Sequence, residues 1–253
     1  MIETCKASDR NMNDYKNLVR LFVPDADYIA GELCALSEGQ AHYLRNVMRQ
    51  SAGDALRVFN GRDGDWLATL SEVKKNKALI KLDHLISEQK PSPDIRVVAS
   101  PVKKDAFDLM IEKSCELGAA KFIPVVCAHT VVHKINQSRL EAIAIEAAEQ
   151  CERSDVMAVQ PLVDLKKYFE SIDSDRNIIF CIERKEAPLL VDVLRPRPKK
   201  PLDILIGPEG GFTEEEINSI MGIKNVHAAS LGPRILRAET ALIAALSVAQ
   251  LFS

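Results

Sequence analysis

The sequence predicts an α/β protein of two domains, in which a small β-rich domain precedes a larger domain with a mostly parallel sheet. Residues 95–253 alternate strand-like apolar runs with helix-like segments, which is typical of a parallel sheet covered by helices. Residues 55–86 instead hold three short strand-like runs separated by turn-forming residues. Residues 87–93 are polar and contain two prolines, so we place the domain boundary there.

The first domain is expected over residues 18–90, after an extension of residues 1–17 without regular structure. Its predicted strands are residues 20–24, 55–59, 66–73 and 78–86. The last three run closely after one another with hairpin-like connections, which indicates a small β-barrel. The sole tryptophan, Trp66, is expected in the core or at the barrel rim, with stacking on a base as the alternative.

One helix is expected in this domain, beginning at Ser37. Gln40 follows three residues later and completes a capping box, in which each side chain bonds to the backbone N–H of the other residue. The helical spacing places Ala41, Leu44, Val47 and Met48 on one apolar face. The opposite, exposed face holds His42, Arg45 and Arg49, which could meet phosphates. An ordinary solvated surface is the alternative interpretation.

The second domain is expected over residues 94–253. Its predicted strands are residues 97–100, 122–127, 178–182, 202–206 and 226–231. Its predicted helices are residues 104–116, residues 138–151 after a capping box of Ser138 and Glu141, a helix from Glu214 after a capping box of Thr213 and Glu216, and residues 239–252. The run at 202–206 is almost continuously apolar, as in a strand buried on both faces.

Two glycine-proline turns each follow one of these strands and lead toward a helix. The turns are Gly207-Pro208-Glu209-Gly210-Gly211 and Gly232-Pro233-Arg234-Ile235-Leu236-Arg237. Open α/β sheets bind ligands beyond the carboxyl ends of their strands, where glycines let backbone amides approach closely. We therefore expect both turns to belong to one ligand site, with tight strand-to-helix connections as the alternative. Neither turn has the residues of a phosphate loop or of a dinucleotide fingerprint, which disfavours a nucleoside triphosphate or NAD.

At these turns the sequence resembles the ribosomal small-subunit methyltransferase E family of the knotted SPOUT superfamily. The resemblance rests on residues 206–213 and 231–241, and it extends back through three further segments. These segments are residues 113–118, residues 146–151 with Arg153, and the segment that holds His42, Leu44, Arg45 and Arg49. The paired motifs in this order are specific, whereas each alone would be a weak signal.

The resemblance implies transfer of a methyl group from S-adenosylmethionine to N3 of a uridine in 16S rRNA of the 30S subunit. It also implies a PUA-like RNA-binding barrel, a trefoil-knotted methyltransferase domain, and a homodimer packed through knot-proximal helices. The apolar helix at 241–252 fits a role in the dimer, and it fits an ordinary buried helix equally well. The implied cofactor-binding residues are Cys181, Ile182, Glu183, Ile206, Gly207, Pro208, Glu209, Gly210, Gly211, Leu231, Gly232, Arg234, Ile235, Leu236 and Thr240. The expected RNA-binding residues are His42, Arg45, Arg49, Lys103, Lys104 and Arg153. A noncatalytic ribosome-assembly factor and a methyltransferase for another RNA nucleotide are the alternatives.

The chemistry implied at N3 of uridine requires a base or a cation. N3 is protonated at neutral pH, so the enzyme must remove the proton or stabilise the negative charge that spreads onto O2 and O4. Arg237 is the first candidate for stabilisation and Arg153 the second, since a guanidinium is permanently charged. Asp155 stands where family members commonly carry a second basic residue, which puts Arg153 in doubt as an RNA ligand. Glu209 and Glu239 are candidate bases, with loop shaping and helix capping as their alternative roles.

Composition excludes several other classes of protein. The longest apolar run, residues 241–252, is too short to cross a bilayer, and the polar start of the chain does not resemble a signal peptide, so we expect a cytoplasmic protein. A net charge of −3 disfavours nonspecific attraction to nucleic acid, although local basic patches can still contact RNA. The six cysteines form no CxxC pair, and His129 and His133 lack a third ligand nearby, so no metal is expected.

Overall fold

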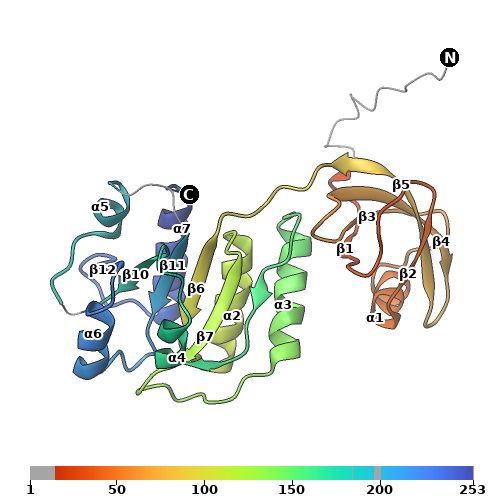
Figure 1. Cartoon of the computed structure of the whole chain (residues 1–253). Helices are drawn as coiled ribbons and strands as arrows, with labels where there is room; N and C mark the ends of the chain where they lie inside the picture. Colours follow the sequence, from red (N-terminus) through yellow and green to blue (C-terminus); the bar gives the residue numbers. More distant parts are fainter. Residues whose placement is uncertain (1–14, 184, 197–200, 253) are drawn as a thin grey trace. The chain divides into compact units, whose positions relative to one another are not determined.

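The computed structural model describes residues 15–183, 185–196 and 201–252 (Figure 1). The chain divides into two compact units between Pro91 and Ser92, inside the predicted linker. Residues 1–14 of the predicted extension lie outside the described residues. Tyr15 was expected in that extension but is buried, and its hydroxyl lies 3.4 Å from Nε2 of His84. Within the described ranges, no helix has the length and hydropathy needed to span a bilayer.

The first unit is built on a five-stranded mixed sheet in the order β1-β3-β4-β5-β2. Its strands are β1 (Arg20–Phe22), β2 (Leu33–Leu36), β3 (Ala55–Phe59), β4 (Asp65–Val73) and β5 (Ala78–Ser87). β1 pairs with β3 in parallel, and the other neighbours are antiparallel. Four strands were predicted. β2 was missed because its four residues include no β-branched or aromatic side chain.

Trp66 takes the predicted place at the edge of the core of this unit. Its ring packs against the buried cluster and meets the ring of Tyr28 edge-on, with centroids 6.0 Å apart. Its indole N–H donates to the carbonyl oxygen of Asp63 at 2.8 Å. Both the apolar body and the polar tip of this side chain are therefore occupied within the fold.

The predicted helix begins at Ser37 but changes character after one turn. Ser37 caps α1 (Glu38–His42) and forms the expected capping box with Gln40. The chain then continues as the π-helix η2 (Tyr43–Val47). In a π-helix the hydrogen bonds join residues five positions apart, not four as in an α-helix. Residues beyond His42 therefore point in other directions than they would on a continuous α-helix.

This change of pitch explains which side chains reach the core. Ala41 and Leu44 are fully buried as predicted, whereas Val47 and Met48 are 59% and 41% exposed, so their predicted core positions are wrong. Arg49 was predicted on the helix but lies beyond its end, in left-handed backbone with a φ of 55°. The helix thus presents apolar as well as basic side chains to solvent.

The second unit contains a wholly parallel sheet, as predicted. Its main order is β12-β10-β11-β6-β7-β8, with β9 also paired to β7. The strands are β6 (Ile95–Ala99), β7 (Lys121–Val126), β8 (Ala158–Val159), β9 (Val163–Asp164), β10 (Asn177–Cys181), β11 (Leu202–Ile206) and β12 (Val226–Ala229). The strands that precede the two glycine-proline turns, β11 and β12, flank β10. Their turns therefore open at the same edge of the sheet.

Helices cover both faces of this sheet. They are α2 (Lys104–Glu116), α3 (Gln137–Gln150), α4 (Leu165–Glu170), α5 (Leu190–Leu194), α6 (Glu214–Met221) and α7 (Ala238–Gln250). α2 packs against α3 and α7, and α7 lies along β11 (Figure 1). On the other face, α4 and α6 pack Leu165, Tyr168 and Ile220 into a core cluster with alternate residues of the strands, such as Ile178 and Phe180.

Two details of these helices differ from the prediction. The side chain of Asn136, not Ser138, caps α3 by accepting from the backbone N–H of Arg139, so the predicted capping box of Ser138 and Glu141 is wrong. The short helices α4 and α5 were missed, because five or six residues are too few to show a helical period. The capping box of Thr213 and Glu216 at α6 is confirmed.

Candidate active site

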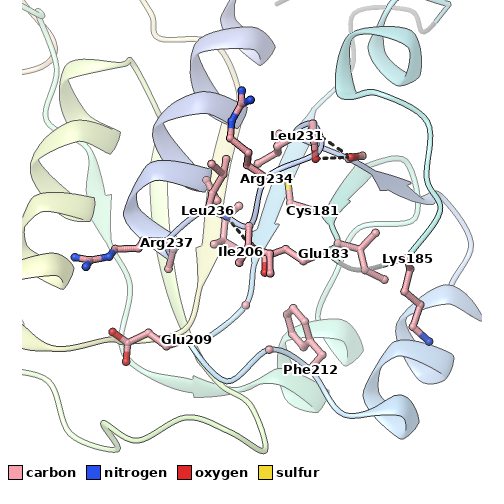
Figure 2. A pocket seen from close by; sticks show the side chains of 18 of the residues that line it. Cys181, Glu183, Lys185, Ile206, Glu209, Phe212, Leu231, Arg234, Leu236 and Arg237 are labelled. Carbon is pink, nitrogen blue, oxygen red and sulfur yellow. Dashed lines mark hydrogen bonds between the residues drawn. The ribbon is translucent and has the colours of Figure 1, made fainter.

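Three loops converge on one cavity at the carboxyl edge of the parallel sheet (Figure 2). They follow β10, β11 and β12, and they contribute lining residues within 181–189, 206–217 and 230–241. The cavity has a volume of about 1370 Å³. Both glycine-proline turns line it, so the two motifs that are separate in the sequence lie together in space.

Nearly all of the predicted cofactor-binding residues line this cavity. Of that set, Thr240 alone is missing from the lining. Several lining residues were not predicted: Lys185, Glu186, Leu189, Phe212, Glu214, Ile217, Ser230, Pro233, Ala238 and Ala241. Phe212 directly follows Gly211 and could have been found from its place in the motif. Leu189 has no local signal, because it lies in an irregular loop.

Two glycines show why these turns exclude side chains. A Cβ atom on Gly207 would lie 2.5 Å from the ring of Phe212, so the turn closes only around glycine. Gly232 has a φ of 111°, which L side chains rarely adopt, and no atom lies within 4 Å of the place where its Cβ would stand. Backbone therefore forms part of the cavity wall.

Charged side chains hold the loops to one another at two points. The carboxylate of Glu183 accepts from the backbone N–H of Leu236 at 3.3 Å, which joins the loop after β10 to the second turn. Lys185 forms an ion pair with Glu214 at 2.6 Å, which joins the same loop to the start of α6. The loop after β10 thus connects both turn-bearing segments.

Arg237 and Glu209 are the candidate catalytic residues that line the cavity. Both side chains are exposed and line the cavity, and in Figure 2 both extend toward the same side of it. Arg237 occupies the N-cap position of α7 without capping the helix through its side chain. Within the described part of the chain, neither side chain makes an ion pair, so both charges are available to a ligand.

Glu239 lies elsewhere. It is half-buried in the first turn of α7, and neither Glu239 nor its neighbour Thr240 lines the cavity. An acidic side chain in the first turn stabilises a helix through the helix dipole. The geometry therefore favours the structural role of Glu239 over the catalytic one.

The cavity also contains a thiol, that of Cys181. Burial raises the pKa of this thiol to about 12. The side chain is therefore protonated at neutral pH, and only the thiolate form of cysteine is a good nucleophile. Covalent catalysis through Cys181 is accordingly disfavoured.

The structure disfavours the predicted RNA contact at Arg153. Its guanidinium is 9% exposed and pairs with Asp155 at 2.8 Å. It also donates to the carbonyl oxygens of Cys115 and Ala119, at 2.7 and 3.1 Å, and to the hydroxyl of Ser92 at 2.9 Å. These bonds fasten the segments that precede β6 and β7. Arg153 is therefore a structural residue, which also removes it as a candidate for catalysis.

The other basic candidates are exposed. Lys103 and Lys104 stand at the start of α2, beyond the carboxyl end of β6, which is the neighbour of β11. Neither lysine forms an ion pair with a described residue. In the first unit, the side chains of His42, Arg45 and Arg49 are likewise exposed. Cations without intramolecular partners are suited to phosphate contacts.

Comparisons with known proteins identify the family. Residues 36–83 match the model described as an RNA methyltransferase PUA domain, and residues 88–250 match the RNA methyltransferase domain. The ribosomal RNA small subunit methyltransferase E of Rickettsia conorii is 30% identical over 216 residues, which cover 85% of this chain and 88% of the relative. The chain belongs to the ribosomal RNA small subunit methyltransferase E family.

Solved structures agree with this assignment to the methyltransferase E family. The family member from Neisseria gonorrhoeae, bound to S-adenosylmethionine, is 28% identical with a TM-score of 0.83, over 92% of this chain and 97% of that chain. A putative methyltransferase from Legionella pneumophila, in complex with the same cofactor, is 30% identical with a TM-score of 0.82 and the same coverage. The predicted fold class, a SPOUT methyltransferase domain after a PUA-like domain, is confirmed.

Proposed function

We propose that this chain methylates N3 of a uridine in 16S rRNA of the small ribosomal subunit, with S-adenosylmethionine as the methyl donor. The observation that carries the proposal is the convergence of the two motif turns and the loop after β10 on one cavity. The Neisseria gonorrhoeae family member and the Legionella pneumophila methyltransferase, which are similar in structure to this chain, are solved with bound S-adenosylmethionine. In this proposal, residues 18–90 bind RNA and residues 94–253 hold the donor.

The chain's own residues suit this donor. The backbone at Gly211 and Gly232 is open to the cavity, because no atom stands within 4 Å of either Cβ position. Backbone groups at such glycines can approach a flat adenine closely. Apolar side chains, among them Ile206, Phe212 and Leu236, offer contacts to the adenine faces. The volume of about 1370 Å³ exceeds the range of roughly 300–1000 Å³ for small-molecule sites, which leaves room for a nucleotide beside the donor.

The bound donor would supply an electrophilic methyl group, and the protein must make N3 of the uridine a nucleophile. Arg237 is suited to stabilise the charge that develops on the uridine oxygens when the N3 proton leaves, because its guanidinium is exposed to the cavity and permanently charged. Glu209 is the carboxylate that could accept the proton, since it lines the same cavity and forms no ion pair with any residue in the described ranges. The remaining task of the cavity is to align N3 with the methyl carbon.

RNA would be recognised by local basic surfaces, not by total charge. His42, Arg45 and Arg49 form one surface in the first unit, and Lys103 with Lys104 forms another near the sheet edge of the second unit. Both surfaces belong to a chain with a net charge of −3, so shape and local charge must guide the contact.

We also propose that the protein acts in the cytoplasm as a homodimer through α7. One face of α7 is buried in the unit, whereas Ile243, Ala244 and Val248 on its other side are only half-buried and Leu251 is 81% exposed. A second copy would cover this apolar face. Light scattering of the purified protein measures the dimer directly.

The trefoil knot implied by the resemblance stays a prediction.

Binding of the donor is the first test. Calorimetry should show binding of S-adenosylmethionine to the wild type and binding weakened about tenfold or more in Gly232→Val, because the new side chain would occupy cavity space next to the turn and L side chains rarely adopt the φ of Gly232. Gly53→Val is the matched control, since Gly53 also has left-handed backbone and open space around its Cβ position but lies in the first unit. A wild-type protein that binds no donor would refute the proposal.

The product is the second test. Nucleoside mass spectrometry of 16S rRNA from a deletion strain should show loss of 3-methyluridine, and the plasmid-borne chain should restore it. A noncatalytic assembly factor would associate with small subunits yet leave this nucleoside unchanged. Methylation of another nucleotide would appear as loss of a different modified nucleoside.

A further inference from the structure

The loop after β7 reaches the first glycine turn by crossing the end of a neighbouring strand. β6 lies between β7 and β11 in the sheet, so this loop must pass the end of β6. The hydroxyls of Ser100 and Thr130, both buried, lie 2.6 Å apart at this crossing. Oγ1 of Thr130 also accepts from the backbone N–H of Cys127 at 2.7 Å. The loop therefore holds a fixed path over β6.

Beyond the crossing, a shared carboxylate fastens the loop to the start of α6. The backbone N–H of Ala128 donates to Oε1 of Glu216 at 2.7 Å. Oε2 of the same carboxylate accepts from the backbone N–H of Thr213 at 2.9 Å, within the capping box of α6. The loop after β7 and the end of the glycine turn thus share one anchor.

His129 forms a second attachment, directly behind the glycine turn. Its Nδ1 lies 3.1 Å from the carbonyl oxygens of both Gly210 and Gly211. Carbonyl oxygens only accept hydrogen bonds, so Nδ1 must carry a proton. A Cβ atom on Gly210 would lie 2.9 Å from Cβ of His129, which shows how closely the two backbones approach. His129 is not part of the cavity lining, whereas both glycines are.

The contact fixes the orientation of a peptide unit in the cavity wall. The C=O and N–H groups of one trans peptide point in opposite directions. When His129 holds the carbonyl of Gly211, it therefore also sets the N–H of Phe212 and the start of the Phe212 side chain, which lines the cavity. The N–H of Gly211 is occupied within the turn, because it donates to Pro208 at 2.8 Å.

We propose that His129 is a positioning residue for the methyl-donor site: its Nδ1–H holds the Gly210–Gly211 turn in the shape that binds S-adenosylmethionine. This inference rests on the proposed function. Nothing in the sequence indicated this role for His129, because the contact joins residues 81 and 82 positions apart.

Three variants test the role of the Nδ1–H group. His129→Ala removes the donor and should raise the Kd for S-adenosylmethionine about fivefold to tenfold, as expected for one lost hydrogen bond. His129→Asn keeps an N–H donor close to the position of Nδ1 and should restore the Kd to within about twofold. His133→Ala is the matched control, since His133 lies on the same loop, is exposed and makes no hydrogen bond with a described residue.

Steady-state kinetics distinguish a positioning role of His129 from a catalytic one. In His129→Ala the KM for the methyl donor should rise, while kcat at saturating donor stays at the wild-type value. Equal donor Kd values for His129→Ala and the wild type would overturn the inference. Absence of donor binding to the wild type would instead overturn the proposed function on which it rests.

A measurement on the wild type covers the case in which His129→Ala does not fold. Nitrogen-15 spectra of the histidine side chains should show Nδ1 of His129 protonated at neutral pH. The assignment comes from the signal that is missing in His129→Asn. An unprotonated Nδ1 would exclude the bonds to the carbonyls of Gly210 and Gly211, and it would overturn the inference without any activity assay.

Discussion

Charged side chains are buried and paired at the amino edge of the parallel sheet, whereas at the carboxyl edge they face an open cavity. At the amino edge, Asp203 is fully buried near the start of β11 and accepts from Arg96 at 2.7 and 2.5 Å, from Arg176 at 3.1 Å and from the hydroxyl of Tyr168. Burial and the charge of Asp203 raise the pKa of Tyr168 well above its usual range, so its hydroxyl stays a donor. At the carboxyl edge, Arg237 and its neighbours face an open cavity.

The difference indicates that charged residues at the amino edge stabilise the fold and that those at the carboxyl edge serve ligand binding. Charges at the amino edge are desolvated, so each must be matched inside the fold. Arg153, between the end of α3 and the start of β8, follows the same rule, because its largely buried guanidinium pairs with Asp155 inside the fold. Charges at the carboxyl edge keep their water until a ligand replaces it. Substitutions at the amino edge should therefore lower the free energy of unfolding, and substitutions at the carboxyl edge should lower activity.

The largest effect is expected from Asp203→Ala. Its removal would leave the buried guanidinium of Arg176 and the largely buried one of Arg96 without their central partner, at a cost of about 3–5 kcal/mol in the free energy of unfolding. Urea denaturation measures this loss. Asp175→Ala, an exposed neighbour, should stay within about 0.5 kcal/mol of the wild type. A loss below about 1 kcal/mol in Asp203→Ala would show that the amino edge does not carry the stability assigned to it.

Arg237→Ala should give the opposite result. Loss of the guanidinium should lower kcat for methyl transfer by about 10²–10³, the usual effect of removing one charge-stabilising donor. The free energy of unfolding should change by less than about 0.5 kcal/mol, because the side chain is exposed. Arg237→Lys keeps the charge but not the fork of donors and should recover only part of the rate. Wild-type turnover in Arg237→Ala would remove its catalytic role.

Arg153→Ala sharpens the comparison, because this arginine was expected to bind RNA. We expect a loss of about 2–3 kcal/mol in the free energy of unfolding, as buried carbonyls lose a charged donor. The RNA affinity of the folded variant should be unchanged. The double variant Lys103→Ala with Lys104→Ala should show the reverse, with weaker RNA binding in a filter assay at unchanged stability. A drop in RNA affinity without a loss of stability in Arg153→Ala would reinstate the RNA role.

The smallest expected effect is a difference in reactivity between the thiols of Cys151, at the amino edge, and Cys181, at the carboxyl edge. The neighbouring Cys115 thiol and Arg153 lower the pKa of the Cys151 thiol below its ordinary value, whereas burial raises that of Cys181 to about 12. Iodoacetamide at pH 7.5 should therefore modify Cys151 before Cys181, as peptide mass spectrometry can show. As the pH is lowered further, the Cys151 thiolate becomes protonated and its modification should slow. Faster modification of Cys181 would contradict this order.

Local signals in the sequence predicted most of the sheet and the principal part of the site. The apolar run of β11 and the capping box of α6 depend only on neighbouring residues, and both are confirmed. The convergence of the two turns followed from a general property of parallel sheets, that their strands end at a common edge. The family resemblance added the third loop, at residues 181–183.

What the sequence did not predict depends on contacts between distant residues. Arg153 looked like a free cation because Ser92 and Cys115, its partners, lie far away along the chain. The π-helical turn that exposes Val47 has no distinctive composition, since the same residues would fit an α-helix. His129 likewise gains its role only when the loop after β7 crosses β6.

The left-handed backbone of Arg49 has a consequence for directed evolution of this protein. A residue with a side chain costs about 1–2 kcal/mol in that conformation, a penalty that glycine avoids. A screen that selects only for thermal tolerance should therefore enrich Arg49→Gly. Such variants would tolerate heating better but would lose a cation from the surface of His42, Arg45 and Arg49 that we propose binds RNA.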